Sequence, residues 1–488
     1  MEHKNQSPWL YQMSSAREGK GLTEDVQTDV AIIGGGIAGV ATAYFTLTCT
    51  KKSVVLLEMG RIAHGATGHN GGFLATYFER SFISLVKEFG LTLAAQGQRD
   101  VESAWELLES MRATAQLKTP VWIFTGYAAI ATEEELLIHL QNLALRTQAG
   151  LEVAPLLVAE DAPAVERIPH AYQGMYKLVT GSELANLLEV KDSAYFAALP
   201  EKKGCTNSAA LCEELVQYML NTYPERFTLL EHTPVEEIQL GAEGVMVRSG
   251  DYTVQSRRVV LCTNGFENVR IVNAVGSDIN KKFHHMVRGI VGYMAGYVEP
   301  SQHPPVEISF LPKSPRKGDD VYAEEPYFYV TRRPFGETEG KPQSLVSIGG
   351  PEALMDDTND YKVDHDYPVR AKEDIDSFLR ATYAKAHPEG ETYKFLWHGL
   401  MGFTPNGVRL VGPEPLNPIL LYNLGCNGIG LMPSIFGGRK IAWFLEEEVL
   451  PTSMFDPVDQ RTPIARPTVP LRVVQDRSVN AASPDNRA

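Results

Sequence analysis

Three glycines and one acidic residue have the spacing of a nucleotide-binding turn. Gly34, Gly36 and Gly39 form a GxGxxG pattern, and Glu58 ends the next apolar run. Because glycine has no Cβ, Gly34 permits a tight turn, Gly36 lets backbone approach a pyrophosphate, and Gly39 allows a helix to pack closely on a strand. The helix N-terminus then faces the phosphates, and Glu58 accepts hydrogen bonds from a ribose while disfavouring a 2′-phosphate. The pattern predicts a dinucleotide site and leaves FAD and NAD open.

The elements around this pattern must place the turn at the end of a strand. Residues 29–33 predict a short buried strand, residues 37–47 a helix and residues 53–58 a second strand, which together form a βαβ unit. The apolar window 30–47 is also about long enough to span a membrane, but its clustered glycines weaken a spanning helix. We therefore predict a strand and a buried helix here, and no integral membrane span.

The rest of the chain alternates between helical and strand patterns. Residues 79–115 are helical in pattern, and Thr132 with Glu135 forms a capping box before an apolar helical face. The cluster of Pro, Lys and Gly at residues 301–320 predicts an exposed loop, and the proline-rich chain beyond Leu450 predicts an extended or disordered tail. Further strands are expected at residues 227–230, 244–247, 258–262, 290–297, 327–331 and 344–348.

The composition is that of a globular protein with an acidic charge balance. The 488 residues carry a formal net charge of −15, which repels nucleic-acid backbones and anionic lipid headgroups. Five cysteines without CxxC spacing indicate neither a disulfide framework nor a zinc ribbon, and they fit a reducing compartment. The polar N-terminus, residues 1–28, lacks the order of a signal peptide. We expect a cytoplasmic protein of two or three folding units that binds no nucleic acid and no metal.

Separated motifs extend the pattern far beyond the glycine turn. They comprise the turn with Glu58, the loop Gly65-Ala-Thr-Gly-His-Asn-Gly-Gly72, the segments at residues 204–208, 232–235 and 259–265, and the closing segments at residues 397–407 and 423–433. On these motifs the sequence resembles the FAD-dependent oxidoreductases of the D-amino-acid oxidase and glycine oxidase superfamily. The loop is similar to that of amine oxidoreductases of the γ-glutamylputrescine type. The resemblance covers most of residues 29–445 and implies FAD as the cofactor.

The resemblance also implies which residues contact FAD. They are Gly34, Gly36, Ile37, Ala38, Gly39, Glu58, Gly65, Ala66, Thr67, His69, Asn70, Gly71, Gly72, Val235, Thr263, Asn264, Gly265, Gly425, Asn427, Gly428, Ile429 and Gly430. A last helix is expected over about residues 434–447, with its positive end toward the flavin pyrimidine edge. His69 falls where dimethylglycine and sarcosine dehydrogenases have a histidine bonded to the flavin. A covalent link through His69 and a noncovalent contact are both compatible with this position.

Two departures from the family pattern bear on the substrate. Met401 stands where the amino-acid-oxidising members carry an arginine, so the expected carboxylate clamp is missing at that point, and Asn406 replaces an aspartate. A bidentate fork could come from another strand, and Arg288 is favoured because it occupies the place of a substrate-domain strand of the family. The other candidates are Arg332, Arg333 and Arg409.

The reaction implied is oxidation of an amine or amino acid by hydride transfer to flavin, giving an imine that hydrolyses, with oxygen or a quinone as electron acceptor. Tyr327 and Tyr329 share one face of a strand and could form an aromatic wall that favours the neutral amine, or could simply pack in the sheet. One alternative is a 2-hydroxy acid or polyol dehydrogenase, and another is a flavin-binding protein without turnover. The dehydrogenase would need a base such as His69, His284 or His398.

The fold class expected is α/β and α+β, with a Rossmann-type FAD-binding domain interleaved with an antiparallel-sheet substrate domain. The FAD-binding domain is predicted to be discontinuous, at residues 26–100, 200–275 and 395–450. The substrate or cap domain is predicted at residues 101–199 and 276–394, and the tail at residues 451–488.

Overall fold

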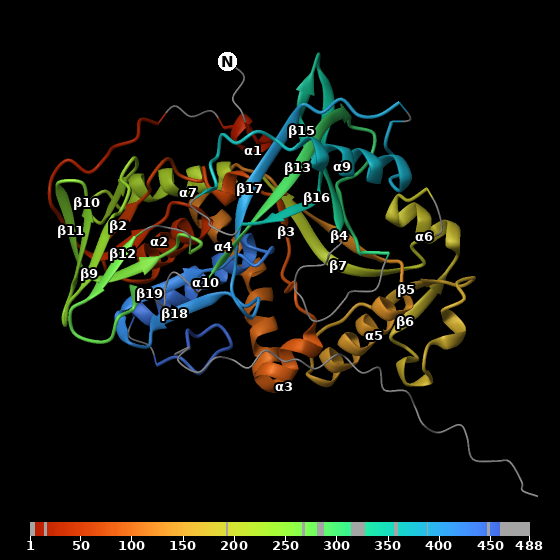
Figure 1. The fold of residues 1–488 in the computed structure, drawn as a ribbon, viewed down its shortest axis with the longest axis horizontal. Coiled ribbons are helices and arrows are strands. Elements are labelled where there is room, and N and C mark those ends of the chain that lie inside the picture. Colours follow the sequence, from red (N-terminus) through yellow and green to blue (C-terminus); the bar gives the residue numbers. More distant parts are fainter. Residues whose placement is uncertain are drawn as a thin grey trace, which may run out of the picture.

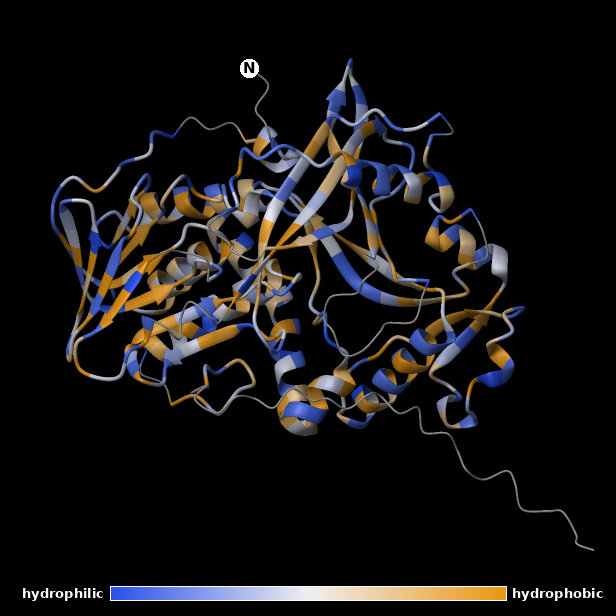
Figure 2. Cartoon of the chain, viewed as in Figure 1, coloured by the Kyte–Doolittle hydropathy of each residue, from blue (hydrophilic) through white to orange (hydrophobic). Residues whose placement is uncertain are grey.

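Two large sheets that lie side by side dominate the structure (Figure 1). Hydrophobic residues gather along the strands of both sheets and on the helices that pack against them (Figure 2). This arrangement confirms the predicted combination of a Rossmann-type unit with a second, mostly antiparallel sheet. The computed structural model describes residues 5–13, 17–191, 194–265, 269–280, 287–313, 327–355, 360–387, 389–446 and 449–458.

The first sheet has parallel strands at its centre. Its order is β12-β9-β10-β11-β1-β2-β8, and β19 pairs with both β11 and β18. The strands β8, β2, β1, β11 and β19 run parallel, whereas β9 and β10 form an antiparallel hairpin beside them. The bounds are β1 (Val26–Ile33), β2 (Val54–Leu57), β8 (Phe227–Leu230), β9 (Glu237–Leu240), β10 (Val245–Ser249), β11 (Tyr252–Leu261), β12 (Arg270–Asn273), β18 (Leu410–Glu414) and β19 (Asn417–Leu424).

The predicted βαβ unit is present as β1, α2 (Ile37–Cys49) and β2. The helix is apolar on nearly every side because it lies between the sheet and α10 (Leu431–Leu445), which it contacts extensively. A Cβ at Gly39 would overlap the carbonyl oxygen of Gly34, so only glycine permits this closeness of helix and strand. Within the described residues no helix has the length and hydrophobicity to cross a membrane.

The second sheet is largely antiparallel and carries the longest strands. Its order is β17-β13-β16-β15-β14-β4-β7-β5-β6, with β3 beside β7. Only β14 with β4 and β5 with β6 pair in parallel among its described strands. The bounds are β3 (Phe73–Leu74), β4 (Val121–Ile130), β5 (Leu156–Ala159), β6 (Tyr176–Val179), β7 (Ala197–Thr206), β13 (Arg288–Pro300), β14 (Val306–Phe310), β15 (Phe328–Thr338), β16 (Lys341–Leu354) and β17 (Phe395–Phe403).

The helical pattern at residues 79–115 forms two helices rather than one. A break at Gly90, whose φ is 80°, interrupts the first of them. The capping prediction at Thr132 is confirmed, because its Oγ1 accepts the N–H of Glu135 at 3.2 Å. The remaining helices are α1 (Pro8–Tyr11), α3 (Phe82–Glu102), α4 (Ala104–Ala115), α5 (Glu133–Gln148), α6 (Gly181–Leu188), α7 (Ser208–Thr222) and α9 (Val369–Ala381), with 3-10 turns η1 (Ala66–Gly68), η2 (Val165–Arg167) and η3 (His170–Tyr172).

The prediction of an exposed loop over residues 301–320 was wrong in part. Residues Val306–Phe310 form β14, in which every residue is buried. Its apolar residues alternate with Glu307 and Ser309, whose side chains contact the buried amino group of Lys203. Flanking prolines and lysines obscured this short strand in the sequence. Residues 314–320 lie outside the described residues.

The chain beyond Leu450 begins by packing on the protein. Met454 and Phe455 are buried, and the ring of Phe455 lies 5.3 Å from that of Phe436 in α10. Residues 459–488 of the predicted tail lie outside the described residues. Strands of the first sheet come from three separated stretches of chain, so the sheets are interleaved in sequence. The segments 200–275 and 395–450 were predicted to belong to the FAD-binding domain. The strands at the start of these segments, β7 and β17, are both part of the second sheet.

Candidate active site

The glycine turn forms a cradle between β1 and α2. Gly34 has φ 106°, and an added Cβ there would lie 2.6 Å from a backbone carbonyl at the end of β11. Gly36 is the N-cap of α2 and has no side-chain cap, while the N–H of Ile37 donates to Thr67 Oγ1 at 3.0 Å. The first turn of α2 carries no acid, so no carboxylate of its own offsets its positive end. The turn and the loop at residues 65–72 therefore meet at an anion-favouring helix end.

Glu58 stands at the carboxyl end of β2 beside this turn. One carboxylate oxygen accepts the N–H of Gly35 at 2.7 Å and the other accepts the N–H of Gly60 at 2.8 Å. Burial raises the pKa of Glu58, and these two hydrogen bonds oppose the rise. Each oxygen keeps acceptor capacity for a hydroxyl. The two hydrogen bonds thus fix the acid beside the glycine turn.

Asn70 fixes the loop at residues 65–72 against α7. Its side-chain amide donates to Thr67 O at 2.6 Å and to Ser208 Oγ at 3.0 Å, and its Oδ1 accepts the N–H of Gly72 at 2.6 Å. A Cβ at Gly65 would meet nothing within 4 Å, so that end of the loop borders open space. The loop therefore has one face held by protein and another free.

His69 is turned toward backbone oxygens. Its Nδ1 lies 3.0 Å from Gly65 O and its Nε2 3.2 Å from Asn5 O. Burial lowers the pKa of His69, so the neutral ring is favoured, although it can donate to only one of these carbonyls. The contact with Asn5 comes from the N-terminal segment (residues 5–13), which no sequence motif indicated as part of the site. That segment also places Trp9 against the loop, where its Nε1 donates to Asn70 O at 2.6 Å.

The end of β11 meets the turn that precedes α10. Asn264, with φ 65°, accepts the N–H of Cys426 at 3.0 Å through Oδ1. Thr263 Oγ1 is buried and has no hydrogen-bond partner within the described residues, so it is available to a ligand. Gly265 follows with φ 97°. Val235 is half-buried and packs on the apolar cluster of the first sheet.

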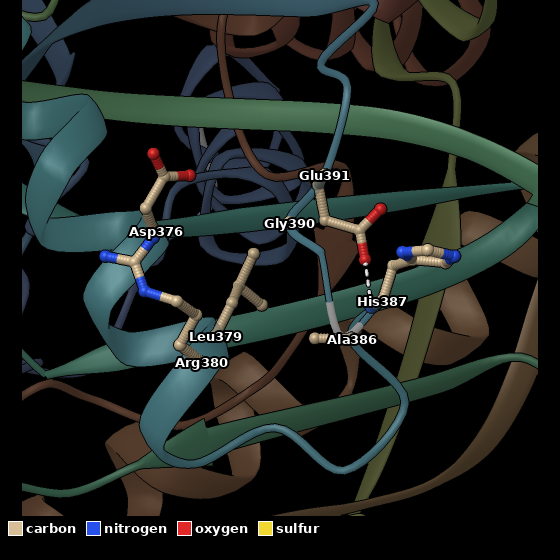
Figure 3. Close-up of a pocket in the computed structure, with 7 residues that line it drawn as sticks. All are labelled: Asp376, Leu379, Arg380, Ala386, His387, Gly390 and Glu391. Atoms are coloured by element: carbon tan, nitrogen blue, oxygen red, sulfur yellow. Dashed lines mark hydrogen bonds between the residues drawn. The ribbon is translucent and has the colours of Figure 1, made fainter.

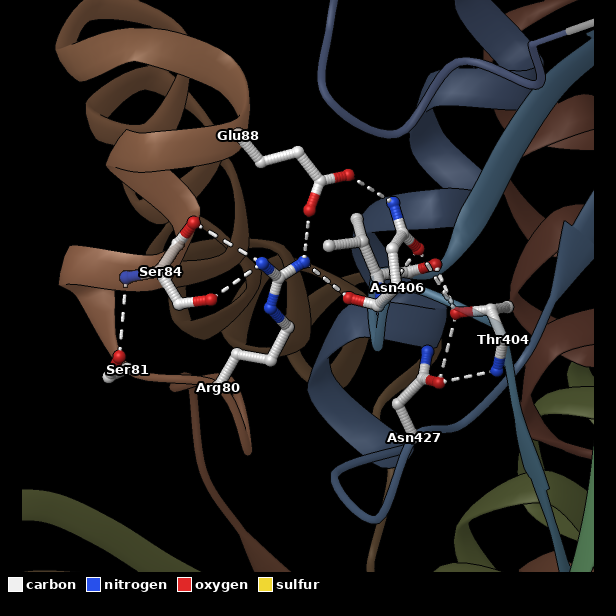
Figure 4. A network of polar contacts seen from close by, with 8 residues as sticks. Arg80, Ser81, Ser84, Glu88, Thr404, Asn406 and Asn427 are labelled. Atoms are coloured by element: carbon white, nitrogen blue, oxygen red, sulfur yellow. Dashed lines mark hydrogen bonds and ion pairs between the residues drawn. The ribbon is translucent and has the colours of Figure 1, made fainter. Parts of the chain in front are cut away.

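The closing turn at residues 425–430 is built around Asn427 (Figure 4). Its Oδ1 accepts the N–H of Thr404 at 2.8 Å, and its own N–H donates to Gly402 O at 2.8 Å. Gly428 has φ 79°, and Gly430 is the N-cap of α10, which starts three residues earlier than predicted and carries no acid in its first turn. The structure therefore brings the closing turn beside the end of β11 and β17.

Asn406 also has a defined role in this network (Figure 4). Its side-chain amide donates to Glu88 Oε1 at 3.0 Å, and its backbone carbonyl accepts from Arg80 Nη1 at 2.6 Å. An aspartate here would set a carboxylate against that of Glu88. Asparagine therefore suits this position because its amide can donate the hydrogen bond to Glu88, which an aspartate carboxylate cannot.

Tyr327 and Tyr329 lie between the two glycine-rich segments. Their ring centroids are 6.1 Å apart, and Tyr327 OH donates to Glu79 Oε1 at 2.7 Å. A Cβ at Gly71 would lie 3.1 Å from the Tyr329 ring, and one at Gly428 would lie 2.9 Å from Glu79 Cγ. Burial raises the pKa of both tyrosines well above the ordinary value, so both stay neutral. The two predicted substrate-side tyrosines therefore sit at the junction of the flavin-type motifs.

Behind this junction the structure gathers four acids and one base. Lys203 is buried and pairs with Glu307, and Glu201 lies 3.6 Å from the same amino group. Glu352 is exposed to solvent near the end of β16, but the protein atoms around its carboxyl group, and then the charge of Glu79, raise its pKa to about 7. The set carries an excess of negative charge. Sequence reasoning missed it because its members come from three strands and a loop without a common spacing.

The arginines proposed as carboxylate forks are mostly committed elsewhere. Arg332 donates to both oxygens of Glu189, at 2.6 and 2.9 Å, and Arg409 donates to Asn423. Arg288 is exposed at the start of β13 and makes no ion pair within the described residues. Met401 occupies the position of the family's arginine and lies against β13. Its Cε is 3.1 Å from the point where a Cβ on Gly292 would stand. That position is apolar.

A small pocket at the end of α9 does not belong to this site (Figure 3). It holds about 10 Å³, roughly one water molecule. His387 N–H donates to Glu391 Oε1 at 2.7 Å across it. The pocket is too small for an organic substrate.

The fold and the site together define a dinucleotide-binding oxidoreductase of the flavoprotein type. Four features of the described residues fit FAD: the glycine cradle, the fixed acid Glu58, the Thr263 hydroxyl without a hydrogen-bond partner, and two helices whose glycine N-caps offer no side chain. The family described as FAD dependent oxidoreductase, DAO, matches residues 29–443, and the chain belongs to it.

Comparisons with individual proteins agree with this family. A protein of Bacillus subtilis, YhfW, named as a Rieske 2Fe-2S iron-sulfur protein, is 28% identical over 245 residues, which cover 50% of this chain and 41% of that protein. Gamma-glutamylputrescine oxidoreductase of Escherichia coli is 37% identical over 73 residues, 15% of this chain and 17% of that protein. The matches thus span less than half the length of these curated relatives.

Solved structures show the same fold at low identity. Glycine oxidase from Geobacillus kaustophilus aligns with a TM-score of 0.63 and 16% identity over 88% of this chain and 98% of that one. L-proline dehydrogenase from P. horikoshii aligns with a TM-score of 0.63 and 16% identity over 89% and 97% of the two chains.

Proposed function

We propose that this protein oxidises the C–N bond of an amine, with FAD as the electron acceptor in the site. The observation that carries the proposal is the junction of Tyr327, Tyr329 and Glu79, which touches both glycine-rich segments expected to hold FAD. When bound, FAD would supply a two-electron acceptor for a hydride from the carbon beside nitrogen. The resulting imine is hydrolysed by water to a carbonyl compound and an amine or ammonia.

The charges around the junction favour an amine over an amino acid. Glu79 and Glu352 present carboxyl groups, whereas the position of the family's arginine is occupied by Met401. A substrate carboxylate would meet negative charge there, and an ammonium group would be attracted. Arg288 stays a candidate for a contact with a more distant part of the substrate.

Protein side chains also set the protonation state of the amine. Glu352, with its pKa raised to about 7, can accept a proton from a substrate ammonium near neutral pH. Once the Glu352 carboxyl is protonated, the neutral rings of Tyr327 and Tyr329 form a wall that favours the neutral amine over its cation. These residues bind and orient the amine and hold its proton.

The hydroxy-acid alternative requires a free imidazole, and the structure favours it less. His69 has a backbone oxygen at each ring nitrogen. His398 is similarly engaged, because Nδ1 contacts Tyr361 OH at 3.1 Å and Nε2 contacts His365 O at 3.2 Å. His284 lies outside the described residues.

Product analysis with matched substrates tests the proposal. The FAD-loaded protein is supplied with primary amines, amino acids and 2-hydroxy acids of equal chain length, first with oxygen and then with a soluble quinone as acceptor. We expect an aldehyde and ammonia from the primary amines, with whichever acceptor supports turnover. A keto acid from the hydroxy acids and no product from the amines would refute it.

We further propose that FAD is held without a covalent bond. Both ring nitrogens of His69 contact carbonyl oxygens, and a bond to either would displace one of these contacts. Acid precipitation of the purified protein should therefore release the yellow colour to the supernatant. Colour that stays with the pellet of the wild-type chain and leaves it in His69→Ala would show a covalent anchor instead.

A further inference from the structure

A second pocket lies apart from the candidate active site. It has a volume of about 330 Å³ and is bordered by the start of β4, the start of α7, the N-terminal segment (residues 5–13) and β15. Trp9 links it to the loop at residues 65–72, since the edge of the indole approaches Gly72 and its face lies against Arg333, which lines the pocket. The volume is at the lower end of the range for small-molecule sites.

Arg333 brings an uncompensated positive charge to this pocket. Its side chain is 3% exposed, and it donates to two neutral acceptors, Gln12 Oε1 at 2.7 Å and Pro334 O at 3.3 Å. Its Nε is buried without a hydrogen-bond partner, and no carboxylate forms an ion pair with it within the described residues. Burial lowers the pKa of Arg333 to about 10. A buried charge of this kind is costly unless an anion joins it.

The neighbouring arginine shows what a paired guanidinium looks like in the same strand. Arg332 is equally buried but has both oxygens of Glu189, the hydroxyl of Tyr383 and the carbonyl of Pro304. The contrast indicates that the missing partner of Arg333 is not a general property of β15. The guanidinium carbon of Arg333 instead lies 4.3 Å from the centre of the Trp9 ring.

Other walls of the pocket suit a flat anion. Asn207 and Ala210 contribute the N-terminal turn of the 15-residue helix α7, whose positive end lies at the pocket. Trp122 and Phe335 supply aromatic surface. Glu214 of that helix, which contacts the pocket residue Thr119, accepts three hydrogen bonds from Lys118 and Thr119, at 2.7, 3.0 and 3.1 Å.

We propose that this pocket binds a small organic anion, a carboxylate on a flat apolar body. The guanidinium of Arg333, which lines the pocket, would receive the carboxylate oxygens, and the aromatic walls would cover the apolar body. This site is independent of the proposed amine oxidation. Through Trp9, its occupant would adjoin the loop at residues 65–72, which is expected to contact the cofactor.

Calorimetric titration of the FAD-loaded protein with benzoate, and with benzamide as the neutral isostere, tests this site. We expect one benzoate site whose filling leaves the visible flavin spectrum unchanged, and at least tenfold weaker binding of benzamide. Arg333→Met should weaken benzoate binding by at least tenfold. Ala210→Leu keeps Arg333 and fills the pocket, so it should do the same even where Arg333→Met fails to fold.

Two matched controls define the result. Arg257→Met removes an exposed positive charge elsewhere, and Gln217→Leu adds a leucine on an exposed position of α7. Both should bind benzoate as the wild type does. The proposal is overturned if benzoate does not bind, if benzamide binds equally, if Ala210→Leu binds normally, or if the bound benzoate perturbs the flavin spectrum and competes with an amine.

Discussion

Single residues show how this chain departs from its family without losing the local structure. Asn406 replaces an aspartate and donates to Glu88, and Met401 replaces an arginine and covers the backbone of Gly292. An aspartate at position 406 would set a carboxylate against that of Glu88, so this substitution is matched by its neighbour. The glycines and Glu58 were predictable because their spacing is local. Glu79 and Glu352 were not, because only the folded sheets bring them together.

Gly36→Val tests the cofactor cradle. The first Cβ would lie 3.0 Å from Thr67 Oγ1, and a branched side chain would fill the space before α2. We expect the purified variant to lose most of its visible flavin absorbance after gel filtration. Gly241→Val, in the tight turn between β9 and β10, is the matched control and should keep its flavin. Wild-type flavin content in Gly36→Val would mean that the cofactor lies elsewhere.

Glu352→Gln tests the acidic side of the site through pH. A pKa of about 7 means that the carboxyl is mostly neutral below pH 7 and ionised above it. We expect kcat/KM for an amine to rise roughly tenfold from pH 6 to pH 8 in the wild type. The glutamine variant should lack this step, whereas Glu337→Gln on an exposed strand end should keep it. An unchanged profile in Glu352→Gln would remove Glu352 from the mechanism.

At the scale of elements, a short N-terminal segment has more consequence than its length suggests. The helix α1 has four residues, with Ser7 as its cap, and it fixes Trp9 between the loop at residues 65–72 and β17. The sequence did not predict this role of the segment, because a four-residue helix is too short to show a periodic pattern. β14 was missed for a similar reason, since five residues among prolines and lysines give little pattern.

Trp9→Ala tests how much that segment contributes to stability and to flavin retention. The indole is fully buried and contacts Trp397 edge to face at 6.5 Å. Truncation should lower the free energy of unfolding by about 3–5 kcal/mol, measured by chemical denaturation, and weaken flavin retention. Leu178→Ala, at a half-exposed position of β6, should cost less than about 1 kcal/mol. Equal stability of the two variants would show that the segment is not part of the core.

At the scale of the whole molecule, the two interleaved sheets contribute different parts of the candidate site. The first sheet presents the cofactor cradle at the carboxyl ends of its parallel strands, and the second contributes the tyrosines and acids that face it. The sequence predicted the βαβ unit at the centre of the first sheet, because such a unit is encoded over about 30 residues, but it did not predict β9, β12, β18 or β19. Strand order in the second sheet depends on distant pairings such as β13 with β17, which local patterns do not specify.

The most direct measurement is anaerobic mixing of the FAD-loaded protein with a primary amine while the visible flavin absorbance is followed. Amine oxidation predicts a single loss of the oxidised flavin bands, slower when the hydrogens beside nitrogen are replaced by deuterium, with one imine-derived aldehyde per flavin. Retention of the oxidised spectrum with every amine, together with bleaching by a 2-hydroxy acid, would contradict the account.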